Sequence, residues 1–92
     1  MRPYEAVFIF RPEEEEFAEG KSFVKSQLEG AGMSIVKEED MKRRELAYEI
    51  KKEKSGHYYL FEVESEPDAL RAVERSLLLK PEILKYLVVR KS

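Results

Sequence analysis

Positive charge is concentrated in one short stretch of this sequence. Residues 42–54 hold six basic and three acidic side chains, although the chain of 92 residues has a net charge of −2. Lysine and arginine bind phosphate, and the local charge of a surface, not the total, decides which ligand approaches it. This stretch is therefore the first candidate for contact with a nucleic acid.

Residues for catalysis or metal binding are scarce. The chain has no cysteine and one histidine, which excludes thiolate catalysis, Cys-ligated zinc or iron–sulfur centres and sites of several histidines. No Gly-rich phosphate loop and no Gly-flanked serine elbow occurs. His57 has no evident acidic partner in its own strand, so we interpret it as a surface histidine of a hairpin. The sequence predicts a protein without catalytic residues, cofactor or metal.

Length and composition predict a single domain over residues 1–92. A chain of this size buries roughly 60–65% of its unfolded surface, which is enough for one two-layer core. No apolar run is long enough to span a bilayer, and no charged-then-apolar leader precedes the first predicted strand. We therefore expect a cytoplasmic protein that does not contact a membrane.

Apolar periodicity predicts four strands and two helices. Strands are expected over 4–10, 57–64 and 83–90, with a long, irregular edge strand over 33–52 that is interrupted near Asp40. The helix over 13–31 ends at a left-handed Gly32, and the helix over 65–79 has Ser65 as its cap and Pro67 in its first turn. The turn between the second and third strands is assigned to the Gly-containing residues 54–57.

The order of these elements predicts a ferredoxin-like α+β fold of the βαββαβ type. Right-handed crossovers give a four-stranded antiparallel sheet with both helices on one face and the first and third strands in its centre. The alternation places one set of side chains beneath the helices: Ala6, Phe8, Phe10, Tyr59, Phe61, Val63, Tyr86 and Val88. It leaves another set on the open face: Val7, Ile9, Tyr58, Leu60, Leu87 and Val89. Because a contiguous exposed apolar patch usually marks an interaction site, the second set predicts a protein-binding surface.

Two kinds of binding protein are compatible with these features. RNA-recognition motifs share this topology and stack bases on aromatic side chains of the central strands. Tyr58 is suitably placed for stacking, but the other open-face residues are aliphatic. A stand-alone single-strand RNA-binding module is therefore the alternative. The first hypothesis is a protein whose basic hairpin contacts phosphate while its open face holds a second, more basic protein.

Four segments resemble the bacterial small-subunit ribosomal protein S6 family: "MRPYEAVFIFRP", "RRELAYEIKK", "GHYYLFEVE" and "LVVRKS". The resemblance covers essentially the whole chain. It implies a ferredoxin-like fold and a non-catalytic structural role in the platform of the small ribosomal subunit. It also implies a heterodimer with ribosomal protein S18 that binds small-subunit ribosomal RNA cooperatively. The implied RNA contacts are Arg2, Arg43, Arg44, Lys51, Lys52, Lys54, Arg90 and Lys91, and the implied protein-facing residues include Tyr58 and Leu60.

The chain also departs from the pattern of the family. Lys42 stands where the family commonly has glycine, Glu49 stands where it often has proline, and the chain ends at Ser92 while many members continue into an acidic tail. A simpler interpretation of Arg43 and Arg44 is surface pairing with nearby glutamates, which contributes about 0–1 kcal/mol per pair. Without its partner, the chain is expected to be able to self-associate through an edge strand or the open face.

Overall fold

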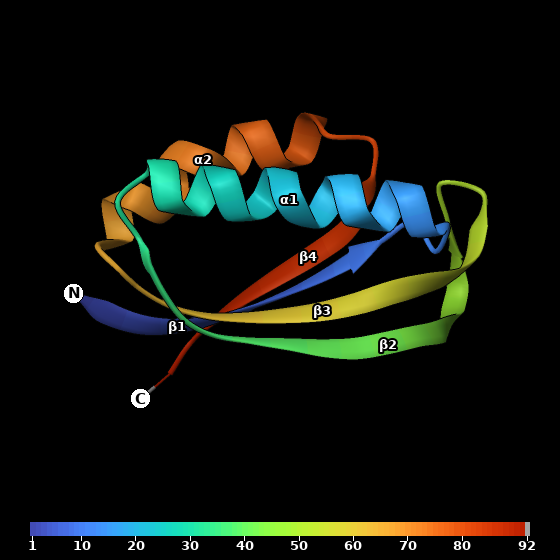
Figure 1. Cartoon of the computed structure of the whole chain (residues 1–92), viewed down its shortest axis with the longest axis horizontal. Coiled ribbons are helices and arrows are strands. Elements are labelled where there is room, and N and C mark those ends of the chain that lie inside the picture. Colours follow the sequence, from blue (N-terminus) through green and yellow to red (C-terminus); the bar gives the residue numbers. More distant parts are fainter. Residues whose placement is uncertain (92) are drawn as a thin grey trace.

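The computed structural model describes residues 1–91, which form a four-stranded antiparallel sheet covered by two helices. The elements are β1 (Arg2–Phe10), α1 (Glu14–Gly30), β2 (Ser34–Ile50), β3 (Glu53–Ser65), α2 (Pro67–Leu79) and β4 (Ile83–Arg90). The strand order is β2-β3-β1-β4, and both helices lie on the same face of the sheet (Figure 1). The ferredoxin-like fold and the central positions of β1 and β3 are confirmed.

The core lies between the helices and one face of the sheet. The side chains of Phe8, Phe10 and Phe61 are fully buried there, and α1 adds Val24 and Leu28. Of the eight side chains predicted beneath the helices, six are buried, while Tyr86 and Val88 of β4 are only partly buried against the core. The predicted alternation is therefore correct, but the helices cover β4 less completely than β1 and β3.

Strand β2 is an irregular edge strand. Its pairing with β3 shifts register between Ile35 and Lys37, between Asp40 and Lys42 and between Glu45 and Ile50. At the second shift Lys42 takes a left-handed backbone conformation, with φ of 72°, and its N–H donates to Asp40 Oδ1 at 2.8 Å. The predicted interruption near Asp40 is confirmed as a bulge. Bulges of this kind protect an edge from pairing with other chains.

The turn of the β2–β3 hairpin is not where the sequence predicted it. Residues 54–57 belong to β3, and the chain turns at Lys51 and Lys52, which have φ of 49° and 68°. Ile50 pairs with Glu53, so this is a two-residue turn with positive φ at both positions, the type that matches the twist of a hairpin. Gly56 instead allows a close approach, because a Cβ there would overlap Ile9 Cγ2.

The helix ends agree with the prediction at one place and differ at another. Gly32 has φ of +86°, as expected after the end of α1. Ser65, however, belongs to β3 and donates to the Glu66 carbonyl at 2.8 Å, and Glu66 is the N-cap of α2 without a side-chain cap bond. The predicted Ser65 cap is wrong because β3 extends further than its apolar alternation indicated. No helix within residues 1–91 is long and apolar enough to cross a membrane.

Candidate nucleic-acid and protein interfaces

The predicted basic residues lie at two opposite ends of the sheet. Arg2 pairs with Ser65 and Arg90 pairs with Tyr4, which places Arg2, Arg90 and Lys91 at the end where β1 begins. The other five predicted residues belong to the β2–β3 hairpin, beyond the end where β1 finishes. Because β1 has nine residues at roughly 3.3 Å each, about 26 Å separates the two groups. They cannot contact the same phosphate.

At the hairpin end, three of the predicted cations surround one surface hollow. This hollow has a volume of about 740 Å³ and is lined by Arg43, Arg44 and Lys54, with Ser55 and Tyr48. Two glutamates, Glu45 and Glu49, also line it. Figure 1 shows the hairpin bending upward at the end of the sheet, so the hollow belongs to the outermost part of the molecule. Its cations are accessible to a large, charged ligand.

The two arginines are held by neutral groups. Arg43 Nε donates to Ser55 Oγ at 3.3 Å, and Arg44 Nε donates to the Met41 carbonyl at 3.2 Å. The Arg44 guanidinium also lies over the ring of Tyr58, 5.7 Å from its centroid. Within residues 1–91, neither guanidinium forms an ion pair with a carboxylate, so the surface pairing considered for them does not occur there. Their charge is available to an external anion.

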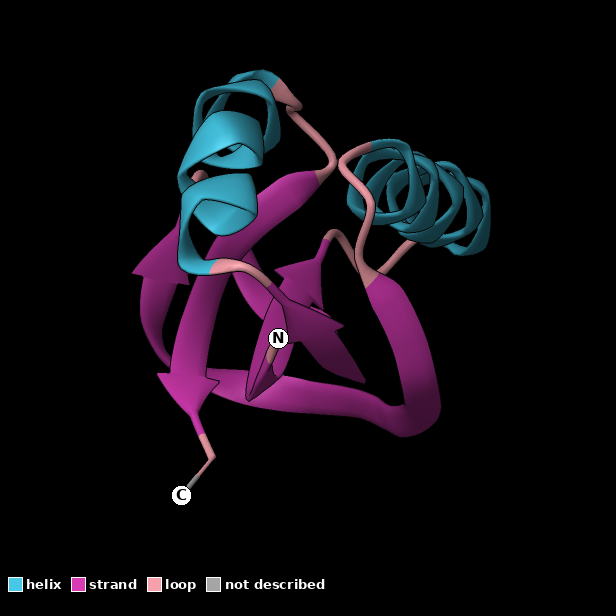
Figure 2. Ribbon diagram, turned by 90° about the vertical axis from the view of Figure 1, so that its left-hand side faces the viewer, coloured by secondary structure: helices cyan, strands magenta, loops and turns pink. Residues whose placement is uncertain are grey.

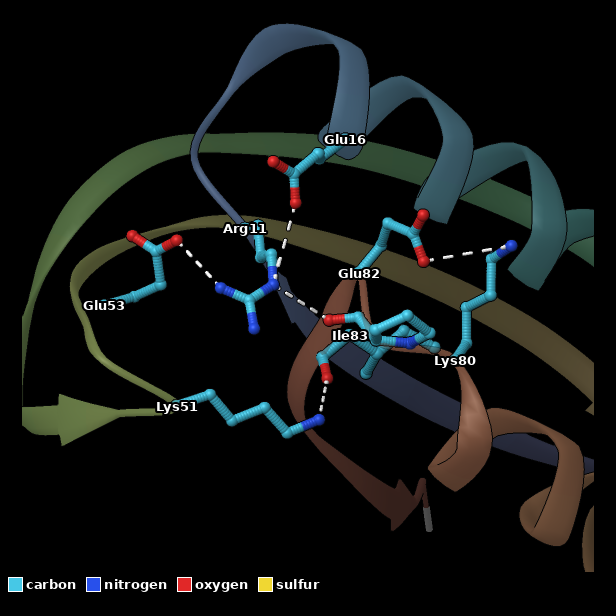
Figure 3. A network of polar contacts seen from close by, with 8 residues as sticks. Arg11, Glu16, Lys51, Glu53, Lys80, Glu82 and Ile83 are labelled. Atoms are coloured by element: carbon cyan, nitrogen blue, oxygen red, sulfur yellow. Dashed lines mark hydrogen bonds and ion pairs between the residues drawn. The ribbon is translucent and has the colours of Figure 1, made fainter.

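Polar contacts fix the hairpin to the rest of the fold (Figure 3). Arg11, between β1 and α1, contacts Glu53 at 2.9 Å and Glu16 at 3.6 Å, and its Nε donates to the Pro81 carbonyl at 3.0 Å. Lys51 donates through Nζ to the Ile83 carbonyl at 2.8 Å. The hairpin is therefore attached both to the start of α1 and to the start of β4.

Two of the four predicted lysines already have partners within the chain. Besides Lys51, Lys91 forms an ion pair with Glu62, and this hydrogen bond lowers the pKa of Glu62 and raises the pKa of Lys91. Arg2, Lys52, Lys54 and Arg90 are exposed. The hairpin group of Arg43, Arg44, Lys52 and Lys54 is therefore the larger set of accessible cations.

His57 is more tightly held than the sequence indicated. Its Nε2 lies 2.6 Å from Asp40 Oδ1, and its ring stacks on Phe17 of α1 with centroids 3.6 Å apart. Burial alone would raise the pKa of Asp40, but the hydrogen bonds from His57 and from the Lys42 N–H lower it below its ordinary value. His57 lies in the hairpin, as predicted, but its ring is mostly covered and has an acidic partner on the neighbouring strand. The sequence did not indicate Asp40 as the partner of His57, because Asp40 lies on β2. Which β2 residues face β3 depends on the bulge between Asp40 and Lys42.

The open face of the sheet carries the six predicted apolar residues. Leu87 and Val89 are 61% and 50% exposed, and the other four, Val7, Ile9, Tyr58 and Leu60, are half-buried by their neighbours. Across the strands, Leu60, Val7 and Leu87 lie side by side in one row, because Val7 pairs with both of the others. Neither helix covers this face (Figure 2).

Charges of opposite sign lie at the two ends of this apolar row. Lys42 and Lys85 pair with Tyr58 and Ile9, so they adjoin the patch on the side of the hairpin. On the other side, Glu62 pairs with Glu5, and Glu64 follows on the same face of β3. Glu62 is already ion-paired with Lys91 and Lys37, which leaves Glu5 and Glu64 as the acidic groups of this end. The patch therefore has a basic end, continuous with the hairpin through Arg44, and an acidic end.

Known proteins are similar to this chain in both sequence and structure. The model of the ribosomal protein S6 family matches residues 3–90. The small ribosomal subunit protein bS6 of Treponema pallidum is 38% identical over 90 residues, covering 98% of this chain and 97% of that protein. Its counterpart in Heliobacterium modesticaldum is 38% identical over 94 residues, covering 99% and 97%. A crystal structure of 30S ribosomal protein S6 from Thermotoga maritima is similar with a TM-score of 0.89 at 33% identity, covering 98% of this chain and 87% of that one.

Proposed function

Because the chain belongs to the ribosomal protein S6 family, we propose that it is a structural, non-catalytic constituent of the small ribosomal subunit in the cytoplasm. It binds small-subunit ribosomal RNA through its basic hairpin, cooperatively with a basic protein of the S18 type that docks on the open face. The observation that carries this proposal is the continuity of the two surfaces. Arg44 lines the hairpin hollow and at the same time lies over Tyr58 of the open face.

The charges of the two surfaces favour different ligands: RNA phosphate at the hairpin and a basic protein at the open face. The hairpin supplies accessible cations for phosphate, but the net charge of −2 and the few contacts predict weak RNA binding by the isolated chain. The acidic end of the open face has Glu5 and Glu64 beside the ion-paired Glu62, and these two carboxylates are complementary to a basic protein. A complex in which both proteins contact the RNA adds the contacts of each on one surface.

The alternative, a stand-alone single-strand RNA-binding module, has less support. Such modules stack several bases on aromatic side chains of the central strands. On the central strands of this sheet, the open-face residues Ile9, Val7 and Leu60 are aliphatic, and the one aromatic ring, Tyr58, is already covered by Arg44. The sheet face is therefore better suited to a protein than to unstacked bases.

The RNA part of the proposal is tested with the Arg43→Ala/Arg44→Ala double variant. Binding to a small-subunit ribosomal RNA fragment, in the presence of the S18-type partner, should weaken about tenfold, and the salt slope should fall by about 2 because two phosphate contacts are lost. The matched control is Arg71→Ala/Arg75→Ala, which removes the same charge from α2. Unchanged binding of a folded Arg43→Ala/Arg44→Ala variant would refute the role of the hairpin.

The protein part is tested with Leu60→Asp at the centre of the open face. We expect this charge to weaken the heterodimer in a pull-down far more than it lowers the melting temperature. Leu79→Asp is the control, because Leu79 is 76% exposed on α2 and distant from the open face. If both variants reduce the heterodimer equally, the open face is not the docking surface. If Leu60→Asp impairs folding as much as binding, Leu60 belongs to the core and not to a docking surface.

A further inference from the structure

The outer edge of β4 is free to pair with another strand. Lys91 N donates to the Pro3 carbonyl at 2.9 Å on the inner side of β4. Because hydrogen-bonded pairs alternate in an antiparallel ladder, Leu87 and Val89 also direct their backbone groups toward β1. Residues 86, 88 and 90 then direct their N–H and C=O groups away from the sheet. Unlike β2, β4 has no bulge along these residues to discourage pairing.

A groove adjoins this free edge on the helix side of the sheet. It has a volume of about 360 Å³ and lies between α2 and the sheet, lined by Leu70, Val73 and Leu77 of α2 and by Tyr86 and Val88 of β4. On its inner side it reaches the core residues Tyr4, Ala6 and Phe8 of β1, Val63 of β3 and Leu28 of α1. Its existence explains why Tyr86 and Val88 are only partly buried. The groove is at the small end of the range of roughly 300–1,000 Å³ for ligand pockets, so it suits one or two apolar side chains.

Charged side chains of opposite sign line the two ends of the groove. Arg71 of α2 and Arg90 of β4 line it at the end where β4 finishes, and Glu74 lines it nearer Tyr86. Within residues 1–91, neither arginine forms an ion pair with a carboxylate. Burial, and then the charge of Glu74, raise the pKa of Tyr86, which agrees with an acidic, partly enclosed position there. An occupant should therefore be acidic at one end and basic at the other.

We propose that the edge of β4 and the groove beneath α2 bind an extended peptide segment of a partner protein as an additional antiparallel strand. Residues opposite Arg90, Val88 and Tyr86 share their side of the sheet, so their side chains point toward α2. Since the added strand runs opposite to β4, its residue facing Arg90 comes first. The segment recognised is therefore acidic, then apolar two residues later, then basic after two more. This site lies outside the hairpin and does not depend on the proposed ribosomal role.

A second copy of this chain competes for the same edge, and the binding test separates it from a partner segment. If β4 paired with another β4 about Val88, each Arg90 would face Tyr86 of the other copy, and the nearest acidic side chain would be Glu74 of that copy. A partner segment instead places an acidic residue opposite Arg90 and a basic residue near Glu74 without bringing a second α2 to the same edge. Charge complementarity at both ends of one groove therefore favours a partner segment that supplies both charges itself.

The test uses the full chain and a fluorescein-labelled peptide, Ser-Thr-Asp-Thr-Leu-Thr-Lys-Thr-Ser, with blocked ends. Its threonines favour an extended strand, and its Asp, Leu and Lys have the predicted spacing. We expect saturable binding by fluorescence anisotropy, with amide shifts in NMR spectra concentrated on residues 86–90 and on α2. A peptide with Leu replaced by Ser and one with Asp and Lys exchanged should each bind more weakly. No saturable binding of the first peptide, or shifts on the hairpin or the open face instead, would overturn the proposal.

Two further variants test the arginines of the groove and the backbone edge of β4 one at a time, in proteins that remain folded. Arg71→Glu/Arg90→Glu should weaken binding about tenfold and should reduce the preference over the exchanged peptide, whose Asp still meets Glu74; Arg75→Glu, one turn further along α2, should change binding less than about twofold. Val88→Pro removes an outward N–H but no bond to β1, so it should abolish binding in a folded protein. Equal binding by all variants, or dimerisation of the chain through β4 in sedimentation experiments, would contradict the proposal.

Discussion

The two edges of the sheet are built in different ways. The β2 edge shifts register at three places, carries charges on most exposed positions and has a left-handed residue at Lys42. The β4 edge is short, and its outward face adjoins an apolar groove with two arginines at its rim. Bulges and charges discourage strand pairing, so β2 is suited to ligands that bind through side chains, whereas β4 is suited to backbone pairing.

This difference shows how one small fold can offer separate surfaces without a second domain. The β2–β3 hairpin extends beyond the ends of the central strands, which moves its cations away from the core and toward solvent. It is held there by the polar contacts of Arg11 and Lys51 and by the close approach of Gly56 to Ile9. At β4 the surface arises because α2 leaves a gap above Tyr86 and Val88. The basic surface depends on the extension of the β2–β3 hairpin beyond the sheet, and the groove at β4 depends on the incomplete cover of that strand by α2.

Gly56→Val should lower the stability of the protein more than any other substitution proposed below, because Gly56 lies where the hairpin meets β1. The new Cβ would overlap Ile9 Cγ2 and lie 3.3 Å from the Phe10 carbonyl, so the hairpin must move away from β1. We expect a loss of about 3 kcal/mol in the free energy of unfolding measured with urea, at the upper end of overpacking effects. Gly30→Ala is the control, because a Cβ there meets nothing within 4 Å. Equal stabilities would show that the hairpin does not need this close approach.

Most of the fold could be predicted from the sequence because it follows from apolar alternation. Residues such as Phe8 and Phe61 at period two fix which side of each strand is buried, and two strand–helix–strand crossovers leave few topologies. The hairpin turn could not be predicted in this way. Lys51 and Lys52 are not turn formers, while the nearby Gly56 is, although its role is to let Ile9 approach.

The candidate sites could be predicted only in part, for a similar reason. The open-face residues follow from the alternation, and the basic hairpin follows from composition. The contact between His57 and Asp40 depends on the bulge at Lys42, which shifts β2 against β3. The groove depends on the distance between α2 and β4, and no pattern in either segment records this distance. The His57–Asp40 contact and the groove both depend on how two elements pack against each other. The sequence within either element does not specify that packing.

Lys42→Gly should stabilise the protein by relieving backbone strain at the bulge of the β2 edge. Lys42 has φ of 72°, which costs a residue with a Cβ roughly 1–2 kcal/mol and costs glycine almost nothing. After the greater entropy of glycine in the unfolded chain is subtracted, we expect a gain of about 1 kcal/mol in urea unfolding. The same change at Lys85 on β4, where φ is not positive, should lower stability. A loss at both positions would mean that the bulge is not strained.

Glu38→Gln should have the smallest effect and should appear only in the dependence of stability on pH. Glu38 ties the β2 edge to α1 and β3, because its carboxylate lies 3.0 Å from Lys25 Nζ and accepts a hydrogen bond from the Tyr59 hydroxyl at 2.8 Å. The Lys25 hydrogen bond is the main reason why the pKa of Glu38 is lowered from 4.5, and burial opposes it. A lowered pKa means that the folded state favours the ionised form. The resulting stability is present above pH 4.5 and is lost as the pH falls through the lower pKa of the folded state.

The variant should therefore unfold with a shallower dependence on pH below 4.5 than the wild type, while above it the difference in free energy stays under about 1 kcal/mol. Urea unfolding at several pH values measures both quantities. Asp40 and Glu62 also have lowered pKa values, so the slope should decrease but not vanish. Glu39→Gln is the matched control, because Glu39 lies on the opposite face of β2 and its ion-pair partner within residues 1–91 is Lys37, at 3.7 Å. If both variants flatten the curve equally, the attachment of the β2 edge to α1 does not depend on the charge of Glu38.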